Sequence, residues 1–376
     1  MNVHITDSTP SDEKYLRRFC EPPGYLDFAR FGPLSADVGE TLTRAVAAAV
    51  RHPVEALAEA EREEAAAVRA GAALLGAARH EVALVSSTSH GMFAAAHALR
   101  GPGAVLVART DFPAAVYPWL RAAERGGLTV RMVDGPVTAA TVRPHLDEGL
   151  RAVSVCAVDA TTGFRTPLAE LKDLIGPRRV LVVDAVQALG AVEFAADAAD
   201  VLASGGQKWL RSGWGAALLL VRDRVAELLR PGLGGWSGVR DPLGEHAHPR
   251  PVLPGAVAHT FTNPDGHAVA ALRTGLDLVR SVGVKRIAGL VTESLARLLD
   301  AAHAAGAETE GGTGSGIARL RLPGVEPVAL HRALTDAGLV TTLRGPWIRL
   351  SPHATTHHDT PARLASALRA TASPRS

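Results

Sequence analysis

The stretch Val180-Leu-Val-Val-Asp184-Ala-Val-Gln187 is the most informative part of this chain. Its first four residues are all apolar, which is typical of a strand buried on both faces of a parallel sheet. A carboxylate ends the strand, and an amide follows three residues later. Downstream, Val201-Leu-Ala-Ser204-Gly-Gly-Gln-Lys208 is a second apolar run that ends in a glycine-rich turn with a lysine. Because ligands of open parallel sheets bind at the carboxyl ends of strands, these two ends predict a binding site.

The sequence around this stretch alternates between short apolar runs and helical patterns. Further strands are predicted at residues 82–86, 104–108, 129–133, 152–158 and 216–221, with helices at 90–100 and 167–175 among them. Apolar strands between amphipathic helices indicate an α/β fold. We expect a large domain with a mainly parallel sheet of the seven-stranded type, covered on both faces.

After Pro264 the pattern changes to that of a smaller α+β domain. Helices are predicted at 266–282, 285–305, 327–337 and 361–371, and strands at 317–322 and 347–351. We therefore divide the chain into an N-terminal arm (1–24), a large domain (25–263) and a small C-terminal domain (264–376). The first twenty or so residues and the tail 371–376 are expected to be loosely ordered.

Bulk composition excludes several classes of protein. The 376 residues are 47% hydrophobic and 21% charged with a net charge of +2, so there is no basic surface for nucleic acid or for a membrane. No apolar run reaches the roughly 18 residues of a membrane span, and the N-terminus lacks the apolar core of a signal peptide. We expect a cytoplasmic protein. Two cysteines, Cys20 and Cys156, cannot build a disulfide framework or a cysteine-rich zinc site.

Three of these residues match the parts that a pyridoxal 5′-phosphate (PLP) site needs. A carboxylate must keep the pyridine nitrogen protonated, a donor should lie by the phenolic oxygen, and a lysine must form the Schiff base. Asp184, Gln187 and Lys208 suit these roles in that order, and Lys208 is one of only four lysines. Taken singly, Asp184 could cap a helix and Lys208 could be a surface lysine. Their joint occurrence at this spacing favours the cofactor site.

With these motifs, the chain resembles the fold-type I PLP enzymes of the class-V aminotransferase group. This group includes cysteine desulfurases, kynureninase, isopenicillin N epimerase-like proteins and cysteine-conjugate lyases. The resemblance extends from Tyr25-Leu-Asp-Phe-Ala to Trp347-Ile-Arg-Leu-Ser-Pro-His353, and its most specific part is the D-x-x-Q motif followed by the lysine turn. It implies a PLP-dependent enzyme that acts on an amino-acid substrate.

The resemblance also implies how the phosphate is held. The turn Ser86-Ser-Thr88-Ser89-His90 corresponds to the family's phosphate-binding turn before a helix, which suits anions, although a simple N-cap is the alternative. His90 stands where relatives have threonine. Gln207 replaces the usual histidine before the lysine, and Ser204 is expected to supply the hydroxyl that relatives have at the position of Gly205.

Other segments of the family's site are matched less closely. Phe112 is the expected stacking residue on the cofactor ring, with a packed core phenylalanine as the alternative. The asparagine of relatives is missing near residue 160, and Asp159 or Thr161 is expected to replace it. Thr260 and Thr262 correspond to a segment that reaches the phosphate of the neighbouring subunit, which implies a homodimer with shared sites. A helix N-cap is the alternative there.

Two arginines are assigned to the substrate. Arg349 matches the family's R-x-S motif for the substrate carboxylate, and its planar fork suits bidentate binding. Arg30 is unusual for the N-terminal segment and could bind a second acidic group or face solvent. His353, His357, His358 and Asp359 are interpreted as a polar loop before a helix, and no metal is expected.

The remaining question is the reaction. Cysteine desulfurases need a mobile nucleophilic cysteine late in the chain, and no cysteine follows Cys156. By family analogy we expect a carbon–sulfur lyase that processes a cysteine S-conjugate in specialised metabolism. A decarboxylating oxidative deaminase, an epimerase, an aminotransferase and a kynureninase-like hydrolase remain as alternatives. A hypothesis of another class is a catalytically silent PLP-binding regulator.

Overall fold

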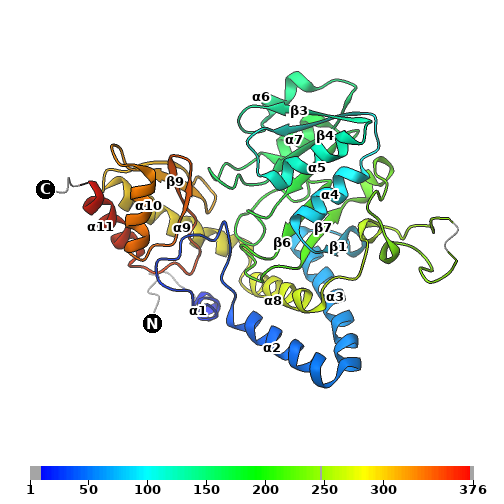
Figure 1. Ribbon diagram of the computed structural model, residues 1–376, viewed down its shortest axis with the longest axis horizontal. Coiled ribbons are helices and arrows are strands. Elements are labelled where there is room, and N and C mark those ends of the chain that lie inside the picture. Colours follow the sequence, from blue (N-terminus) through cyan, green and yellow to red (C-terminus); the bar gives the residue numbers. More distant parts are fainter. Residues whose placement is uncertain (1–9, 246–247, 373–376) are drawn as a thin grey trace.

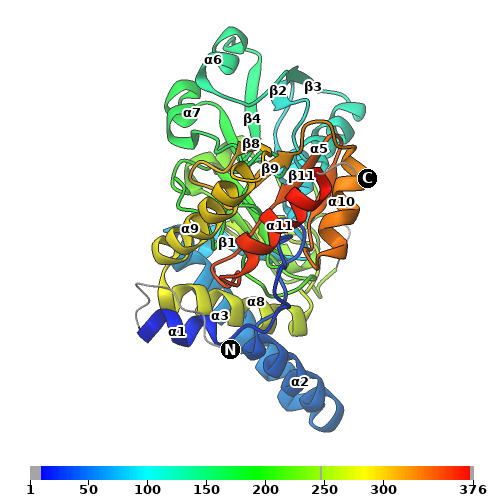
Figure 2. The same ribbon diagram turned by 90° about the vertical axis from the view of Figure 1, so that its left-hand side faces the viewer.

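The computed structural model describes residues 10–245 and 248–372, which form two lobes (Figures 1 and 2). The large lobe is built on a seven-stranded sheet with the strand order β1-β7-β6-β5-β4-β2-β3. Its strands are β1 (Val82–Val85), β2 (Gly103–Ala108), β3 (Leu128–Val133), β4 (Leu150–Cys156), β5 (Val180–Asp184), β6 (Val201–Gly205) and β7 (Ala217–Val221). Strands β2 to β6 pair in parallel, and β7 is antiparallel to both of its neighbours. The predicted mainly parallel sheet is confirmed.

Both faces of this sheet are covered by helices, which explains the continuous apolar runs of its strands. Val180 and Val182 of β5 join one core with α4 (Thr88–Ala98) and α5 (Pro113–Glu124). Leu181 and Val183 point to the opposite face and join a second core with α3 (Pro53–Leu75), α7 (Leu168–Ile175) and α8 (Gly266–Val282). Because successive residues of a strand alternate between faces, all four must be apolar. The short α6 (Ala139–Val142) lies between β3 and β4.

The long helix α8 lies beside α2 (Ala36–Arg51) and α3 below the large sheet (Figure 1). Its bounds agree with the helix predicted at 266–282. Leu272 and Leu276 of α8 are fully buried in the core that also contains β5. The packing of α8 is thus shared with the large lobe, and the division of the chain at residue 264 stays a prediction.

The N-terminal arm contains a packed helix, α1 (Pro10–Leu16). Tyr15 is only 3% exposed, and the buried carboxylate of Asp12 pairs with Arg286 of α9 (Val284–His303) at 2.7 Å. The expectation of loose order is therefore wrong for residues 10–16, because the aromatic ring and the ion pair hold this turn of helix against the body. Residues 1–9 and 373–376 lie outside the described part of the chain.

The small lobe is an antiparallel four-stranded sheet with helices packed on it. The strand order is β10-β11-β9-β8. Its elements are α9 (Val284–His303), β8 (Glu308–Gly311), β9 (Ala318–Arg321), α10 (Pro327–Asp336), β10 (Thr342–Arg344), β11 (Trp347–Leu350) and α11 (Thr360–Ala372). Leu295, Leu320, Ile348 and Leu364 form its core. The predicted α+β lobe is confirmed, although β8 and β10 were not anticipated. Among the described residues, no helix combines the length and the apolar character that crossing a membrane would require.

Candidate active site

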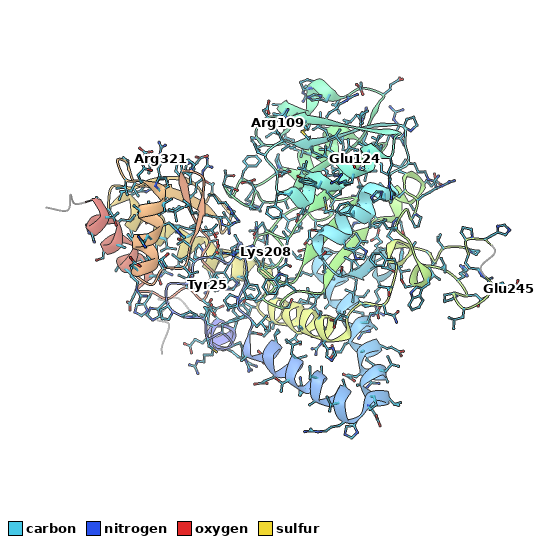
Figure 3. The ribbon with its side chains drawn as sticks, viewed as in Figure 1. Tyr25, Arg109, Glu124, Lys208, Glu245 and Arg321 are labelled. Atoms are coloured by element: carbon cyan, nitrogen blue, oxygen red, sulfur yellow. The ribbon has the colours of Figure 1, made fainter. Side chains whose placement is uncertain are left out.

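Lys208 lies in a tight turn that directly follows β6, where the two lobes meet (Figure 3). Ser212 closes the turn, since its backbone N–H and its hydroxyl donate to the carbonyl of Gly206 at 2.9 and 3.0 Å. A Cβ atom on Gly206 would lie 2.0 Å from the Ser212 hydroxyl, so the turn requires glycine there. The glycine-rich sequence thereby places a lysine at the carboxyl edge of the sheet.

Asp184 ends β5 beside this turn and is 2% exposed. Its Oδ1 accepts a hydrogen bond from the backbone N–H of Val186 at 3.0 Å, whereas its Oδ2 is buried without a partner. Burial raises the pKa of this carboxyl, and the backbone hydrogen bond and the positive charge of Lys208 oppose the shift. A buried carboxylate oxygen without a donor is rare in a native fold. A protonated ring nitrogen would supply that donor.

The amine of Lys208 is prepared for covalent chemistry. Burial lowers the pKa of Lys208 to about 8, with Asp184 opposing the shift and the charge of Arg349 adding to it. A lowered amine pKa leaves more of the neutral, nucleophilic form near neutral pH. The Nζ atom lies 5.4 Å from the ring centroid of Phe112, which stands at the N-cap of α5 and is 44% exposed. An accessible aromatic face near the lysine is what a stacking residue requires.

Gln187 is held rigidly between two neighbours. Its Oε1 accepts from the indole N–H of Trp209 at 2.9 Å, and its Nε2 donates to the carbonyl of Ala29 at 2.9 Å. An amide nitrogen carries two N–H groups, so one remains for a ligand. The predicted hydrogen bond from Gln187 to the cofactor is compatible with this geometry and stays a prediction.

The start of α4 forms the second half of the site. The hydroxyl of Thr88 accepts from the backbone N–H of Gly205 at 2.8 Å, which joins the start of α4 to the lysine turn. Ser87 caps α4 by accepting from the N–H of His90 at 3.1 Å. The Oγ of Ser204 and the Nε2 of His90 are buried without partners. Free helix N–H groups with unpartnered hydroxyl and imidazole groups suit a phosphate.

Two further residues that were predicted to bind the phosphate, Ser89 and Gln207, are not among these buried groups without partners. Ser89 is exposed, and no hydrogen bond of its hydroxyl is found among the described residues. The backbone carbonyl of Gln207 accepts a hydrogen bond from the backbone N–H of Gly32 at 2.9 Å, which connects the lysine turn to the N-terminal segment. His90 also stacks on Phe261 at 4.3 Å between ring centroids, and burial lowers its pKa.

These unpartnered atoms fit PLP. The carboxylate oxygen of Asp184 matches the ring N–H, the groups of Ser204 and His90 match the phosphate, and Lys208 matches the aldehyde carbon. When bound, PLP supplies an electron sink for the α-carbon of an amino acid.

Arg349 on β11 is buried, with 3% exposed, and it is near enough to Lys208 for its charge to act on the amine. One Nη donates to Asp27 Oδ1 at 2.8 Å, and the other donates to the carbonyl of Ala160 at 2.7 Å. The hydroxyl of Thr342 donates to the same Asp27 oxygen at 2.7 Å. The Nε of Arg349 is buried without a partner, which leaves a donor for a substrate carboxylate.

A partly buried acid that was not predicted, Asp111, lies near Asp184. Cys156 is the direct neighbour of Asp184 in the register of β4 and β5, and its backbone N–H donates to Asp111 Oδ2 at 3.3 Å. Burial raises the pKa of Asp111 to about 6. Burial and the two nearby carboxylates raise the pKa of the Cys156 thiol, which makes it a poor nucleophile.

Several predicted site residues make other contacts in the structure. Asp159 Oδ1 accepts from the backbone N–H groups of Thr161 and Thr162 and from the Thr162 hydroxyl, so it caps its own turn. The hydroxyl of Thr260 is satisfied by Val257 and Ser237 within the chain. Thr262 and Arg30 are exposed. Their roles toward cofactor, partner subunit and substrate stay predictions.

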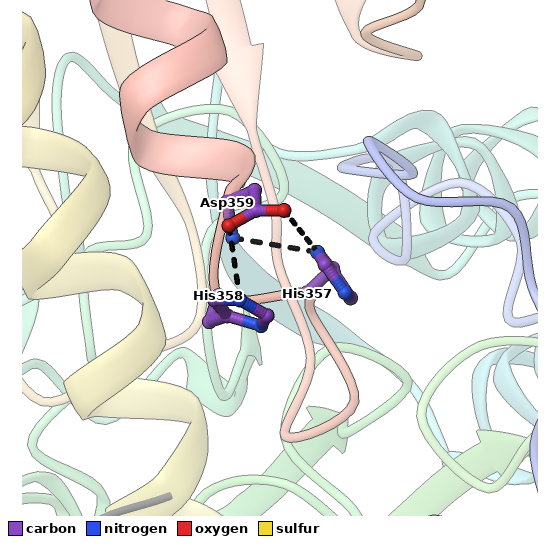
Figure 4. A group of neighbouring side chains, drawn as sticks. All are labelled: His357, His358 and Asp359. Carbon is purple, nitrogen blue, oxygen red and sulfur yellow. Dashed lines mark hydrogen bonds and ion pairs between the residues drawn. The ribbon is translucent and has the colours of Figure 1, made fainter. Parts of the chain in front are cut away.

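The histidine cluster lies in the loop before α11 (Figure 4). His358 Nε2 and Asp359 Oδ1 are 3.0 Å apart, and His357 Nδ1 lies 3.5 Å from Asp359 Oδ2. One ligand atom from each of the three residues falls within 4.8 Å of the others, so their geometry would admit an ion. Asp359 is 62% exposed and already pairs with both rings. The interpretation as a polar loop stays a prediction.

The sequence profile of the family described as aminotransferase class-V matches residues 33–339. The chain belongs to the class-V aminotransferase family. It is accordingly a PLP-dependent enzyme, as its site residues indicate.

Relatives within the class-V aminotransferase family have different reactions. An uncharacterized aminotransferase of Bacillus subtilis is 28% identical over 296 residues, which are 75% of this chain and 76% of that protein. Kynureninase of Deinococcus radiodurans is 31% identical over 240 residues, which are 61% of this chain and 57% of that enzyme. A probable cysteine desulfurase of Xylella fastidiosa is 26% identical over 243 residues, 61% of this chain and 57% of that protein.

Solved structures of class-V aminotransferase type share the whole fold. A cysteine desulfurase of Thermococcus onnurineus superposes with a TM-score of 0.81 at 17% identity, covering 93% of this chain and 94% of the other. A cystine C–S lyase in complex with cysteine persulfide superposes with a TM-score of 0.83 at 18% identity, covering 92% and 97%. At these identities the likeness establishes the fold alone.

Proposed function

We propose that this class-V aminotransferase is a carbon–sulfur lyase that processes a cysteine S-conjugate in specialised metabolism. The observation that carries the proposal is the placement of Arg349 beside Lys208. A substrate carboxylate bound at the free Nε of Arg349 would direct the Cα–H bond toward the lysine amine. We further propose that the enzyme works in the cytoplasm as a homodimer.

The protein residues divide the work as follows. Lys208 would hold PLP through its amine, and the same amine, when free, would remove the Cα proton as a general base. The bond from Cβ to sulfur then breaks with its electron pair on sulfur, and the thiolate takes up a proton. Water replaces nitrogen at Cα. In sum, the S-conjugate and one water give a thiol, pyruvate and ammonium, with no net oxidation.

Other reactions of the family have less support in this chain. A persulfide route lacks its nucleophile, since no cysteine follows Cys156 and the Cys156 thiol is buried with a raised pKa. The exposed Cys20 lies on the N-terminal arm beside α1 rather than at Lys208. A decarboxylating enzyme would have to leave the bond from Cα to the carboxylate free to break, which binding of that carboxylate by the buried Arg349 would oppose. A silent PLP-binding regulator would use Asp184 and Lys208 to hold PLP, but it would not need the free donor of the buried Arg349.

The test is product analysis of the PLP-loaded protein with a panel of L-cysteine S-conjugates. Stoichiometric pyruvate, ammonium and free thiol support the lyase. Carbon dioxide with an aldehyde, a D-amino acid, or a 2-oxo acid that keeps its β-substituent would each replace the proposal by the corresponding alternative. A protein that binds PLP and turns over no amino acid would indicate the regulator.

A further inference from the structure

Two arginines near Arg349 are left without a partner. Arg30 and Arg344 are both exposed, and neither side chain forms a hydrogen bond or an ion pair with any described residue. Most other arginines of the small lobe are paired, as Arg319 is with Glu310 and Arg321 is with Glu308. Arg344 is thus one of the few arginines of the small lobe without a partner among the described residues, and it lies on the strand that pairs with the strand of Arg349.

The backbone at Arg30 is fastened to the cofactor site. The N–H of Arg30 donates to the carbonyl of Asp27 at 3.0 Å in a turn. The preceding carbonyl, of Ala29, accepts from the amide of Gln187 at 2.9 Å, and the N–H of Gly32 donates to the carbonyl of Gln207 at 2.9 Å. A residue between two such anchors has a fixed Cα position, so only its long side chain is free to follow a ligand.

Arg344 is held on the other side of Arg349 by the small sheet. It lies two residues after Thr342 on β10, and residues at this spacing share one face of a strand. The hydroxyl of Thr342 contacts both Asp27 at 2.7 Å and Arg349 at 3.4 Å. The side chain of Arg344 therefore projects from the same face of β10 as Thr342, the face toward the cluster of Arg349, Asp27 and Thr342.

The charges around this cluster do not balance. Asp27 compensates Arg349, with 2.8 Å between them and both side chains less than 5% exposed. Arg30 and Arg344 add two positive charges, and both are near enough to help lower the pKa of Arg349 after burial has done so. An excess of positive charge next to the residue that receives the α-carboxylate attracts a second anion.

We propose that Arg30 and Arg344 determine specificity by binding a carboxylate at the far end of the substrate's β-substituent. The substrate class is then a cysteine S-conjugate with a distal carboxylate, such as an S-(carboxyalkyl)-cysteine. This inference rests on the proposed function. Guanidinium groups bind carboxylates through paired N–H donors, so two of them at flexible tips can accept substituents of more than one length.

The test compares two isosteric ligands, S-carboxymethyl-L-cysteine and S-carbamoylmethyl-L-cysteine, which differ by one negative charge. Their dissociation constants for the PLP-loaded protein are measured from the change in the cofactor's visible absorption and by calorimetry. The wild-type protein is expected to bind the carboxylate about 3- to 10-fold more tightly, the size that one or two partly exposed ion pairs supply. Arg30→Gln and Arg344→Gln should each reduce this preference, and the double variant should abolish it.

Arg69→Gln is the matched control, because Arg69 is an exposed arginine without a partner on α3 and its loss changes the net charge equally. It should keep the wild-type preference. Equal binding of both ligands by the wild type, no binding of either, or an unchanged preference in the Arg30→Gln/Arg344→Gln double variant would overturn the proposal. The lyase reaction is judged separately from pyruvate release, so selective binding without pyruvate would reject the reaction and keep the specificity.

Discussion

The amine of Lys208 has a pKa that burial lowers to about 8, compared with an ordinary lysine value of 10.5. Only the neutral amine attacks the aldehyde of PLP, and at pH 8 about half of this lysine is neutral. Covalent attachment of PLP to the cofactor-free protein should therefore accelerate roughly tenfold per pH unit below pH 8 and level off above it. The measurement is the growth of the visible absorption band after rapid mixing at pH 6 to 9.

The controls for this prediction are two lysine variants. Lys208→Ala should show no visible band, while Lys285→Ala, which changes an exposed lysine at the start of α9, should behave as the wild type. A rate without pH dependence, or a normal band in Lys208→Ala, would contradict the assignment.

A substitution of Asp184 should lower the activity of the enzyme without lowering its stability. Because burial raises its pKa in the folded protein, the folded state holds the proton more firmly than the unfolded state, and the buried charge costs stability above that pKa. Asp184→Asn removes this charge. The variant should lose roughly 100-fold or more in kcat, since the ring nitrogen loses its ionic partner. Its cofactor-free form should unfold at no lower temperature than the wild type at pH 7.5. Full activity, or a large loss of stability, would remove Asp184 from its assigned role.

At the scale of elements, the lysine turn is held to the N-terminal arm and the small lobe by Arg211. Its guanidinium donates to the carbonyl of Pro33 at 2.7 Å and to the hydroxyl of Thr355 at 3.1 Å, and it pairs with Glu21. It also lies 3.6 Å from the centroid of Phe19. Arg211 has a φ of 54°, a left-handed value that a non-glycine residue rarely adopts. These contacts compensate the backbone conformation that the turn requires.

Removing Arg211 should destabilise the protein far more than removing the whole ion pair. Arg211→Ala leaves the buried carboxylate of Glu21 without its cation, with the Thr355 hydroxyl as its remaining donor, and such a change costs about 3–5 kcal/mol. The double variant Arg211→Met/Glu21→Gln removes both charges and should recover at least half of that loss. The measurement is urea denaturation of the PLP-loaded proteins. If Arg211→Ala is as stable as the wild type, the contacts of Arg211 do not stabilise the fold.

At the scale of the whole molecule, the proposed homodimer makes a prediction about shared sites. If the exposed hydroxyl of Thr262 binds the phosphate in the neighbouring subunit, Thr262→Val should weaken PLP binding about 10- to 100-fold, the size of one hydrogen bond to a charged group. Mixing Thr262→Val chains with inactive Lys208→Ala chains should restore tight PLP binding in the mixed dimers. There, the intact Lys208 site receives an intact Thr262 from its partner.

Two outcomes would exclude a shared site. A protein that remains monomeric and fully active at all concentrations in ultracentrifugation has no partner to supply Thr262. Mixed dimers in which the PLP affinity of the Lys208-containing site stays weakened would place the Thr262 hydroxyl in its own subunit's site.

The elements that were predicted correctly are those in which consecutive apolar residues indicate burial. β5 was correct in both bounds because each of its residues is apolar up to the terminal Asp184. β8 and β10 were missed, since β8 has the sequence Glu-Thr-Glu-Gly with little burial and β10 has three residues that end in the exposed Arg344. Such short, polar strands exist because a neighbouring strand pairs with them, which no local pattern reports.

The sequence by itself determined most of the elements in their order and the family, and it predicted Asp184, Gln187 and Lys208 as the residues that hold PLP at strand ends. These follow from patterns within a few residues, because alternation and turn chemistry are local. Only the tertiary structure decided that Arg349 pairs with Asp27, 322 residues away, and that Arg30 and Arg344 have no partner among the described residues. It also decided which oxygen of Asp184 is free and how far the pKa of Lys208 falls. Burial and charge pairing depend on groups that only folding brings together, and their energies therefore have no signature in the order of residues.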